Sequence, residues 1–355
     1  MITKIAGLFN NSKFDTVLIT NWADLFYLTG IEKVYDYWLL LEKSGKMTLL
    51  VPEIIHSQVY NLAKTSGYFN KFRIIKVTGV LAGLKSCLKA DKINCLGIDP
   101  DRITCSTAEK LQKICKIIKI PGLISKYRLI KTPEEIENIR KSCQLISKIY
   151  DELKPMIQPG MTEKDVLLRL FGLYNKYNIE PSFDPIIASG PNTAYPHHIT
   201  STRKIQKNDI IMVDIGCRYK GYCSDLTRTF FLGKINDHFK RIYNIIAYIQ
   251  GYTMKKVRPN KRVAELDKIA RDFIAEKKLK NKFIHSTGHG IGIEIHESPR
   301  IAAKNSGYTG NIRLKPGMII TIEPGVYIPN IFGVRIEDTI LVTKTGNDVL
   351  TETKS

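Results

Sequence analysis

The sequence predicts a two-domain α+β protein, in which a small α/β domain precedes a larger domain of long helices and strand-rich segments. The first observation is length, because 355 residues exceed what one hydrophobic core usually holds. The second is that short apolar strands alternate with helical stretches over the first third of the chain. The third is a pair of helix-then-strand segments, 133–232 and 237–342, which indicates a duplicated topology. We therefore expect domains at residues 1–126 and 127–355.

The first domain is expected to form a sheet with a core of its own. Ser44 and Gly45 predict a tight turn between two apolar strands, and a helical stretch follows Pro52. Thr104 is expected to cap a further helix. This domain holds a single histidine and no cluster of metal-ligating side chains. Strands are predicted at Thr16–Thr20, Trp38–Glu42, Met47–Val51, Arg73–Val77 and Asn94–Ile98.

A long helix is expected to open the second domain. Thr132 at the N-cap, Pro133 at the first helical position and Glu135 three residues past the cap form a capping box. Apolar residues keep helical spacing from there to about Leu153. Further helices are predicted after residues 159–162 and, roughly, over 237–256 and 264–278.

Composition excludes several classes of protein. The 54 Lys+Arg and 34 Asp+Glu residues give a net charge of +20, but the basic residues are spread along the chain without a long basic run. We interpret them as a solvated surface and expect no specific nucleic-acid function. No segment fits a signal peptide or a membrane span. Seven cysteines without a C-x-x-C pair predict reduced thiols and a cytoplasmic location.

Carboxylates occur where buried strands should be apolar. Asp214 interrupts the apolar run 210–216, and Asp225 begins the next strand. If the turn over 218–221 is centred between residues 219 and 220, the two aspartates lie directly opposite each other. Opposed residues have Cβ atoms about 4.5–5.5 Å apart, where like charges repel. A bound cation would remove that repulsion.

The same anomaly recurs near the C-terminus. Glu323 ends an apolar strand, and Glu337 lies within another strand on the same face as Arg335, which could orient it or offset its charge. His289 stands between two glycines that do not fit a dinucleotide-binding loop, and we expect them to let the backbone approach a bound group. One imidazole and four carboxylates suit manganese, cobalt or zinc. Their charge suits two ions, an arrangement that activates water for hydrolysis.

These motifs resemble a known family. The order Asp-x10-Asp, Gly-His-Gly-x-Gly, Glu-Pro-Gly and Arg-x-Glu-Asp is similar to that of the dinuclear-metal peptidases, which include methionine aminopeptidase, aminopeptidase P and prolidase and share the pita-bread fold. The resemblance covers about 127–355 and fills all five ligand positions, whereas creatinase shares the fold without the ligands. The first domain resembles the N-terminal creatinase-like domain of the aminopeptidase P and prolidase branch, which methionine aminopeptidases lack.

The resemblance implies a role for each ligand position. Asp214 would bind one ion, and His289 and Glu323 the other, while Asp225 and Glu337 would bridge both. The implied cofactors are two divalent ions, for which we expect manganese, with cobalt or zinc as alternatives.

It also implies the residues that act on substrate. A metal-bridging hydroxide would attack the carbonyl before proline, with Glu323 moving its proton. His197 would contact substrate near the scissile bond, His296 would hydrogen-bond the carbonyl or the tetrahedral intermediate, and Arg335 would lie beside the last ligand. The neighbouring His198 and the more distant His285 are interpreted as structural.

The function expected from the sequence is therefore that of a metal-dependent Xaa-Pro aminopeptidase acting on proline-containing peptides, as a homodimer. The alternative is an Xaa-Pro dipeptidase, or prolidase, which acts on dipeptides only. A further alternative is a non-catalytic pita-bread protein that binds a partner. Tyr327 is left open between lining the pocket and simple packing.

Overall fold

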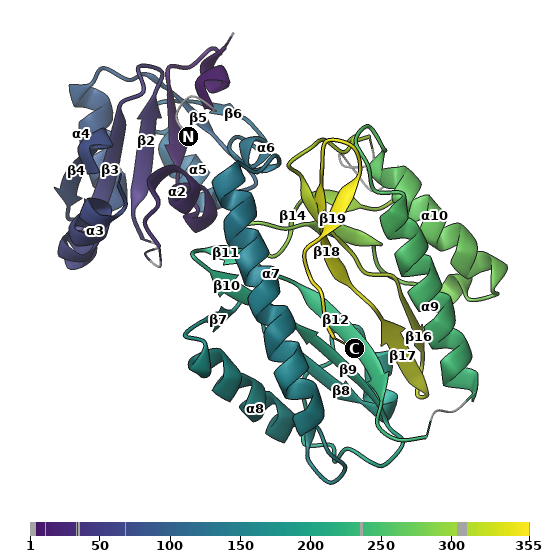
Figure 1. The fold of residues 1–355 in the computed structure, drawn as a ribbon. Coiled ribbons are helices and arrows are strands. Elements are labelled where there is room, and N and C mark those ends of the chain that lie inside the picture. The colour runs from purple at the N-terminus through teal and green to yellow at the C-terminus, as the bar shows by residue number, and fades with distance from the viewer. Residues whose placement is uncertain are drawn as a thin grey trace. The chain divides into compact units, whose positions relative to one another are not determined.

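The computed structural model describes residues 5–10, 12–32, 34, 36–67, 69–234, 237–303 and 311–354. The chain divides into two compact units, Met1–Arg128 and Leu129–Ser355 (Figure 1). The predicted boundary, between residues 126 and 127, lies two residues before this division. Within the described ranges, no helix combines the length and the apolar character that a membrane crossing requires.

The first unit is a mixed six-stranded sheet flanked by helices. Its strands are β1 (Thr16–Ile19), β2 (Trp38–Glu42), β3 (Met47–Pro52), β4 (Phe72–Val77), β5 (Cys95–Ile98) and β6 (Lys116–Lys119). Its α-helices are α2 (Trp22–Thr29), α3 (Glu53–Thr65), α4 (Val80–Ala90), α5 (Cys105–Gln112) and α6 (Ser125–Arg128), with 3-10 turns at Ala6–Phe9 and Phe69–Lys71.

The sheet has the order β4-β3-β2-β1-β5-β6, and β1 pairs antiparallel with β2 but parallel with β5. Leu84 of α4 and Leu111 of α5 pack in one core with Leu50 and Leu96 of the sheet. The five predicted strands are confirmed to within one residue at each end. Thr104 caps α5 as predicted, because its hydroxyl accepts a hydrogen bond from the Thr107 amide.

The second unit has four long helices: α7 (Pro133–Leu153), α8 (Glu163–Lys176), α9 (Asp237–Lys255) and α10 (Val263–Glu276). Its strands are β7 (Glu180–Pro181), β8 (Ile186–Ser189), β9 (Ile210–Ile215), β10 (Cys217–Tyr219), β11 (Tyr222–Cys223), β12 (Leu226–Phe231), β13 (Gly288–Gly290), β14 (Glu297–Ile301), β15 (Ile319–Ile322), β16 (Gly325–Ile328), β17 (Phe332–Arg335), β18 (Asp338–Val342) and β19 (Asn347–Val349). The 3-10 turns are η3 (Lys154–Met156), η4 (Gly190–Ala194) and η5 (Lys280–Lys282).

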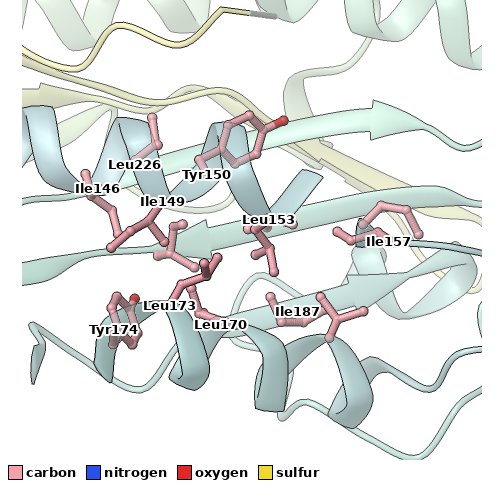
Figure 2. Close-up of a cluster of buried hydrophobic side chains, with 14 of the residues drawn as sticks. Ile146, Ile149, Tyr150, Leu153, Ile157, Leu170, Leu173, Tyr174, Ile187 and Leu226 are labelled. Carbon is pink, nitrogen blue, oxygen red and sulfur yellow. The ribbon is translucent and has the colours of Figure 1, made fainter. Parts of the chain in front are cut away.

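The second unit is built from two similar halves, as the helix-then-strand pattern predicts. In the first half, α7 and α8 pack against the sheet β12-β9-β8, and the interface is the buried cluster of Figure 2. In the second half, α9 and α10 pack against strands of the sheet β14-β13-β15-β18-β19 and the hairpin β16-β17. The predicted capping box at Thr132 is confirmed, with its two reciprocal hydrogen bonds in place, and the helix predicted after residues 159–162 also begins with a capping box, at Thr162.

The two halves meet along β12. The Glu337 amide donates to the Thr227 carbonyl at 3.1 Å, and the Thr229 hydroxyl donates to the Arg335 carbonyl at 2.8 Å. The segment that joins β17 to β18 therefore lies against β12. This contact brings carboxylates of the two halves together.

The predicted register of the two aspartates is wrong by one turn position. Asp214 lies opposite Thr227 rather than Asp225. The turn is centred on Lys220 and Gly221, which both have positive φ, 46° and 79°. Such a pair of residues matches the type I′ hairpin turn, which fixes the strand register around it.

Candidate metal centre

The predicted ligand residues converge where the two halves meet. Asp225, His289 and Glu337 each offer a ligand atom within 4.8 Å of the others, and all three side chains are buried. The His289 Nε2 atom lies 3.5 Å from Asp225 Oδ2 and 3.6 Å from Glu323 Oε1. Residues from β13 and from the ends of three other strands thus share one site.

Asp214 is held at this site by Arg335. The buried guanidinium donates a hydrogen bond from one nitrogen to Asp214 Oδ2, from another to the Tyr327 hydroxyl and from Nε to the Thr227 hydroxyl. The arginine was expected to orient Glu337, but among the described hydrogen bonds its guanidinium is directed to Asp214. The Glu337 carboxylate accepts from the Thr227 hydroxyl at 2.7 Å instead.

The electrostatics of the site are those of crowded buried anions. Burial, followed by the charges of Asp214 and Glu323, raises the pKa of Asp225 well above its usual range. Burial and the charge of Asp225 do the same to the pKa of Glu337. The pKa of Glu323 is also raised, chiefly by burial. Removing water from carboxylates and placing them together disfavours their ionised forms, and a cation among them would reverse that effect.

Two further observations fit a metal ion. Asp214 Oδ1 and Glu337 Oε1 are buried, and no donor from the described residues reaches either oxygen. A buried oxygen without a partner is costly, and a metal ion would satisfy both. His289 Nδ1 lies 3.0 Å from the Gly290 carbonyl oxygen. Because a carbonyl only accepts, Nδ1 carries the proton, and the lone pair of Nε2 faces the carboxylates as a metal ligand requires.

The glycines beside His289 have a different role from the one predicted. A Cβ atom on Gly288 would lie 1.9 Å from the Thr321 carbonyl oxygen, and one on Gly290 would lie 2.2 Å from the Ser298 carbonyl oxygen. The expectation that these glycines admit a bound group is therefore wrong. They admit the neighbouring strands, which pack closely on both sides of β13.

Three histidines surround the carboxylates. The His296 ring lies 4.5 Å from the His289 ring, centroid to centroid. Although His296 is exposed by surface area, the protein around it desolvates the ring, and this desolvation, followed by the charge of His289, lowers its pKa to about 4. His197 is exposed, and its charge is a lesser cause of the lowered pKa values of both His296 and His285. The structure thus places His296 against the ligand His289, and His197 within electrostatic reach of His296 and His285.

A hydrogen-bond relay behind Arg335 was missed by sequence reasoning. The Tyr327 hydroxyl accepts from Arg335 at 2.7 Å and lies 2.9 Å from His285 Nε2. His285 Nδ1 donates to the Ser286 carbonyl at 2.8 Å, and burial lowers the pKa of this ring to about 3. A neutral His285 therefore accepts the Tyr327 proton, which leaves the Tyr327 oxygen to receive Arg335. No spacing in the sequence signals this relay, because its members come from three separate segments.

The chain matches known proteins over its whole length. Residues 137–344 match metallopeptidase family M24, and residues 1–130 match the creatinase/prolidase N-terminal domain. The chain belongs to metallopeptidase family M24. It is 35% identical to the Xaa-Pro dipeptidase of Pyrococcus furiosus, over 99% of this chain and 98% of that one.

Solved structures of this family have the same architecture. The Xaa-Pro dipeptidase from Bacillus anthracis superposes with a TM-score of 0.91 at 33% identity, over 100% of this chain and 97% of that one. The X-Pro aminopeptidase from Thermotoga maritima gives 0.89 at 28% identity, over 99% and 97%. The predicted family, its two-domain pita-bread architecture and the assignment to metal-dependent exopeptidases are confirmed. A dipeptidase and an aminopeptidase thus both superpose closely on this chain.

Proposed function

We propose that this protein is an Xaa-Pro dipeptidase, which hydrolyses dipeptides with proline in the second position. The observation that carries the proposal is its full-length similarity to two archaeal Xaa-Pro dipeptidases, at 35% and 36% identity. The sequence motifs alone favour the aminopeptidase, with the dipeptidase as the alternative. The relatives support the alternative better.

A cation beside the centre supports the same choice. Arg300 lies on the exposed face of β14, and its charge is one of the lesser causes that lower the pKa of His296 and oppose the rise in the pKa of Glu323. A dipeptide places its free carboxylate one residue beyond the scissile bond. An arginine in electrostatic reach of the centre suits that carboxylate, whereas a longer peptide carries a neutral amide there.

The carboxylates and His289 are the residues that would hold the metal. These residues are Asp214, Asp225, His289, Glu323 and Glu337, which would hold two divalent ions between them. Two divalent ions supply a Lewis acid for the substrate carbonyl and a nucleophile at neutral pH. Manganese, the homodimer and the cytoplasmic location stay predictions.

The protein's own groups have distinct tasks in this reaction. Glu323, whose Oε1 lies 3.6 Å from His289 Nε2, is the carboxylate that we assign to take up a proton and release it to the leaving proline nitrogen. His296, with a pKa of about 4, is neutral at pH 7 and can donate an N–H hydrogen bond to the developing oxyanion without changing charge. His197, exposed beside them, is positioned to contact the substrate. Arg335 holds Asp214 in place, because its buried guanidinium donates a hydrogen bond to the Asp214 carboxylate.

The proposal is tested by comparing the cleavage of a dipeptide with that of a tripeptide. Chelator-stripped protein reloaded with Mn²⁺ should cleave Ala-Pro faster than Ala-Pro-Ala, and Glu323→Ala should be inactive on both. Arg300→Gln should raise KM for Ala-Pro more than for Ala-Pro-Ala, while Arg313→Gln, an exposed control whose guanidinium bonds the Asn260 carbonyl, should leave both unchanged. Faster cleavage of the tripeptide would favour the aminopeptidase. No cleavage of any proline peptide would contradict a catalytic role.

A further inference from the structure

A buried carboxylate outside the metal centre organises a loop that reaches the centre. Glu163 is the first residue of α8, and its side chain is 0% exposed. Its two oxygens accept six hydrogen bonds, so the carboxylate is fully satisfied by the protein. The donors are Ser189 N at 2.8 Å, Ser189 Oγ at 2.7 Å, Asn192 Nδ2 at 2.9 Å, His198 Nε2 at 2.8 Å, Ser201 N at 2.9 Å and Ser201 Oγ at 2.6 Å.

All six donors belong to one segment, 189–201, which we call the clamp loop. Glu163 Oε1 binds the start of the loop at Ser189, and Oε2 binds its end at Ser201. The anchor itself is rigid, since α8 begins with a capping box and packs through Leu170 and Leu173 into the cluster of Figure 2. One carboxylate thus fastens both ends of the loop to a fixed helix.

The middle of the clamp loop reaches the metal centre. The Pro196 carbonyl accepts a hydrogen bond at 3.2 Å from Arg335, whose guanidinium also binds Asp214. The Thr193 hydroxyl accepts from the Gly333 amide at 2.9 Å, so the loop is also fixed to β17. His197 follows directly after Pro196.

The clamp depends on the charge of Glu163. Burial would raise the pKa of Glu163, but hydrogen bonds led by those from Ser201 and His198 outweigh it and lower the pKa below its usual range. In a glutamine, one oxygen becomes an NH₂ group that faces three donors and cannot accept from them. An aspartate is one methylene shorter. Neither replacement can hold both ends of the loop.

We propose that Glu163 is a positioning residue that sets the place of His197 against the substrate through the clamp loop. This inference rests on the proposed peptidase function for the role of His197. The clamp itself, six donors from one loop on one carboxylate, is a feature of the fold.

The kinetic test is a double-mutant cycle between Glu163 and His197. Glu163→Gln should lower kcat/KM for Ala-Pro on the order of 100-fold, as expected when a contacting group is displaced by about 1 Å. In a His197→Ala background, Glu163→Gln should lower kcat/KM much less than it does in the parent, because the loop then no longer carries the side chain that it positions. The affinity for Mn²⁺ should stay unchanged in both. A fully additive cycle would mean that Glu163 acts on the fold alone, and would overturn the proposal.

The matched control is Asp165→Asn. Asp165 lies in the same first turn of α8 and loses the same charge, but its carboxylate accepts from the Thr162 amide and has no described bond to the clamp loop. It should keep parental kcat/KM. A loss equal to that of Glu163→Gln would overturn the proposal, since it would trace the effect to the helix start. Should Glu163→Gln fail to fold, His198→Ala, which keeps five of the six bonds, should show the same non-additivity with a smaller loss.

Amide hydrogen exchange tests the anchoring of the clamp loop by Glu163 independently of peptide cleavage. The amides of Ser189 and Ser201 both donate to Glu163, so they should exchange faster in Glu163→Gln than in the parent and in Asp165→Asn. Unchanged exchange at both amides would overturn the proposal whichever peptide is cleaved. If the parent cleaved no proline peptide, the proposed function would fail and exchange would still decide the clamp.

Discussion

Glu163 and the carboxylates of the metal centre, all in the second unit, differ in how their oxygens are hydrogen-bonded. Glu163 accepts six hydrogen bonds, and its pKa is lowered although it is fully buried. At the metal centre, Glu337 Oε1 and Asp214 Oδ1 have no donor among the described residues, and the pKa values of Asp225 and Glu337 are raised. Burial alone therefore does not mark a metal site. Buried carboxylate oxygens that accept no hydrogen bond do indicate a metal site, because a bound cation would compensate for the missing donors.

The largest expected effect comes from the metal centre. Asp225→Asn should lower Ala-Pro hydrolysis at saturating Mn²⁺ by more than about 100-fold, beyond the 10–100-fold cost of losing an outer partner of a metal ligand. In chelator the same variant should have a higher melting temperature than the parent, because it removes a buried charge that its neighbours repel. Steady-state rates and thermal melts measure the two effects. A lower melting temperature in chelator would contradict the comparison.

The clamp should respond in the opposite sense. Glu163→Gln should lower the free energy of unfolding in chelator by about 1–3 kcal/mol, the cost of leaving buried donors unsatisfied. Urea unfolding of the parent, Glu163→Gln and Asp165→Asn measures it. Equal stability of Glu163→Gln and the parent would show that the six hydrogen bonds do not distinguish this carboxylate from those of the centre.

A smaller effect is expected from the relay behind Arg335. Tyr327→Phe removes the hydroxyl that accepts from Arg335 and meets His285, but it keeps the ring packing and the bond from Arg335 to Asp214. Affinity for Mn²⁺ should fall about tenfold, at the lower end for an outer partner of a metal ligand. Titration of the metal measures this. An affinity equal to that of the parent would assign the relay to packing alone.

The smallest expected effect is a pH dependence. The folded-state pKa of Asp225 is raised above its unfolded value, so this group costs stability at every pH above the unfolded pKa; the cost is largest above the folded pKa and is lost as the pH falls from the folded pKa to the unfolded one. In chelator, the stability advantage of Asp225→Asn over the parent should therefore shrink as the pH falls from about 7 to about 5, towards the ordinary pKa of a carboxyl near 4. Titrating groups that are remote from Asp225 are common to both proteins and cancel. Melting temperatures at several pH values test this, and a constant advantage would contradict it.

The sequence predicted the features that depend on residues close together in the chain, and it missed those that depend on residues far apart. The capping boxes at Thr132 and Thr162 need residues three positions apart, so helix starts were predictable. The predicted register of Asp214 was wrong, because the register depends on which two residues of the turn take positive φ, and these are Lys220 and Gly221. The clamp was not predicted, since Glu163 and Ser201 meet across 38 residues of chain.

The sequence by itself determined the family, the two-domain architecture and the residue types of the centre, because ordered motifs and strand-breaking carboxylates can be seen along one dimension. Only the tertiary structure decided which carboxylates have all their oxygens hydrogen-bonded and which do not. It joined Glu163 to six donors of one loop and left Glu337 Oε1 without any donor among the described residues. Hydrogen-bond satisfaction is a property of packed neighbours, and segments far apart in sequence become neighbours only when the chain folds.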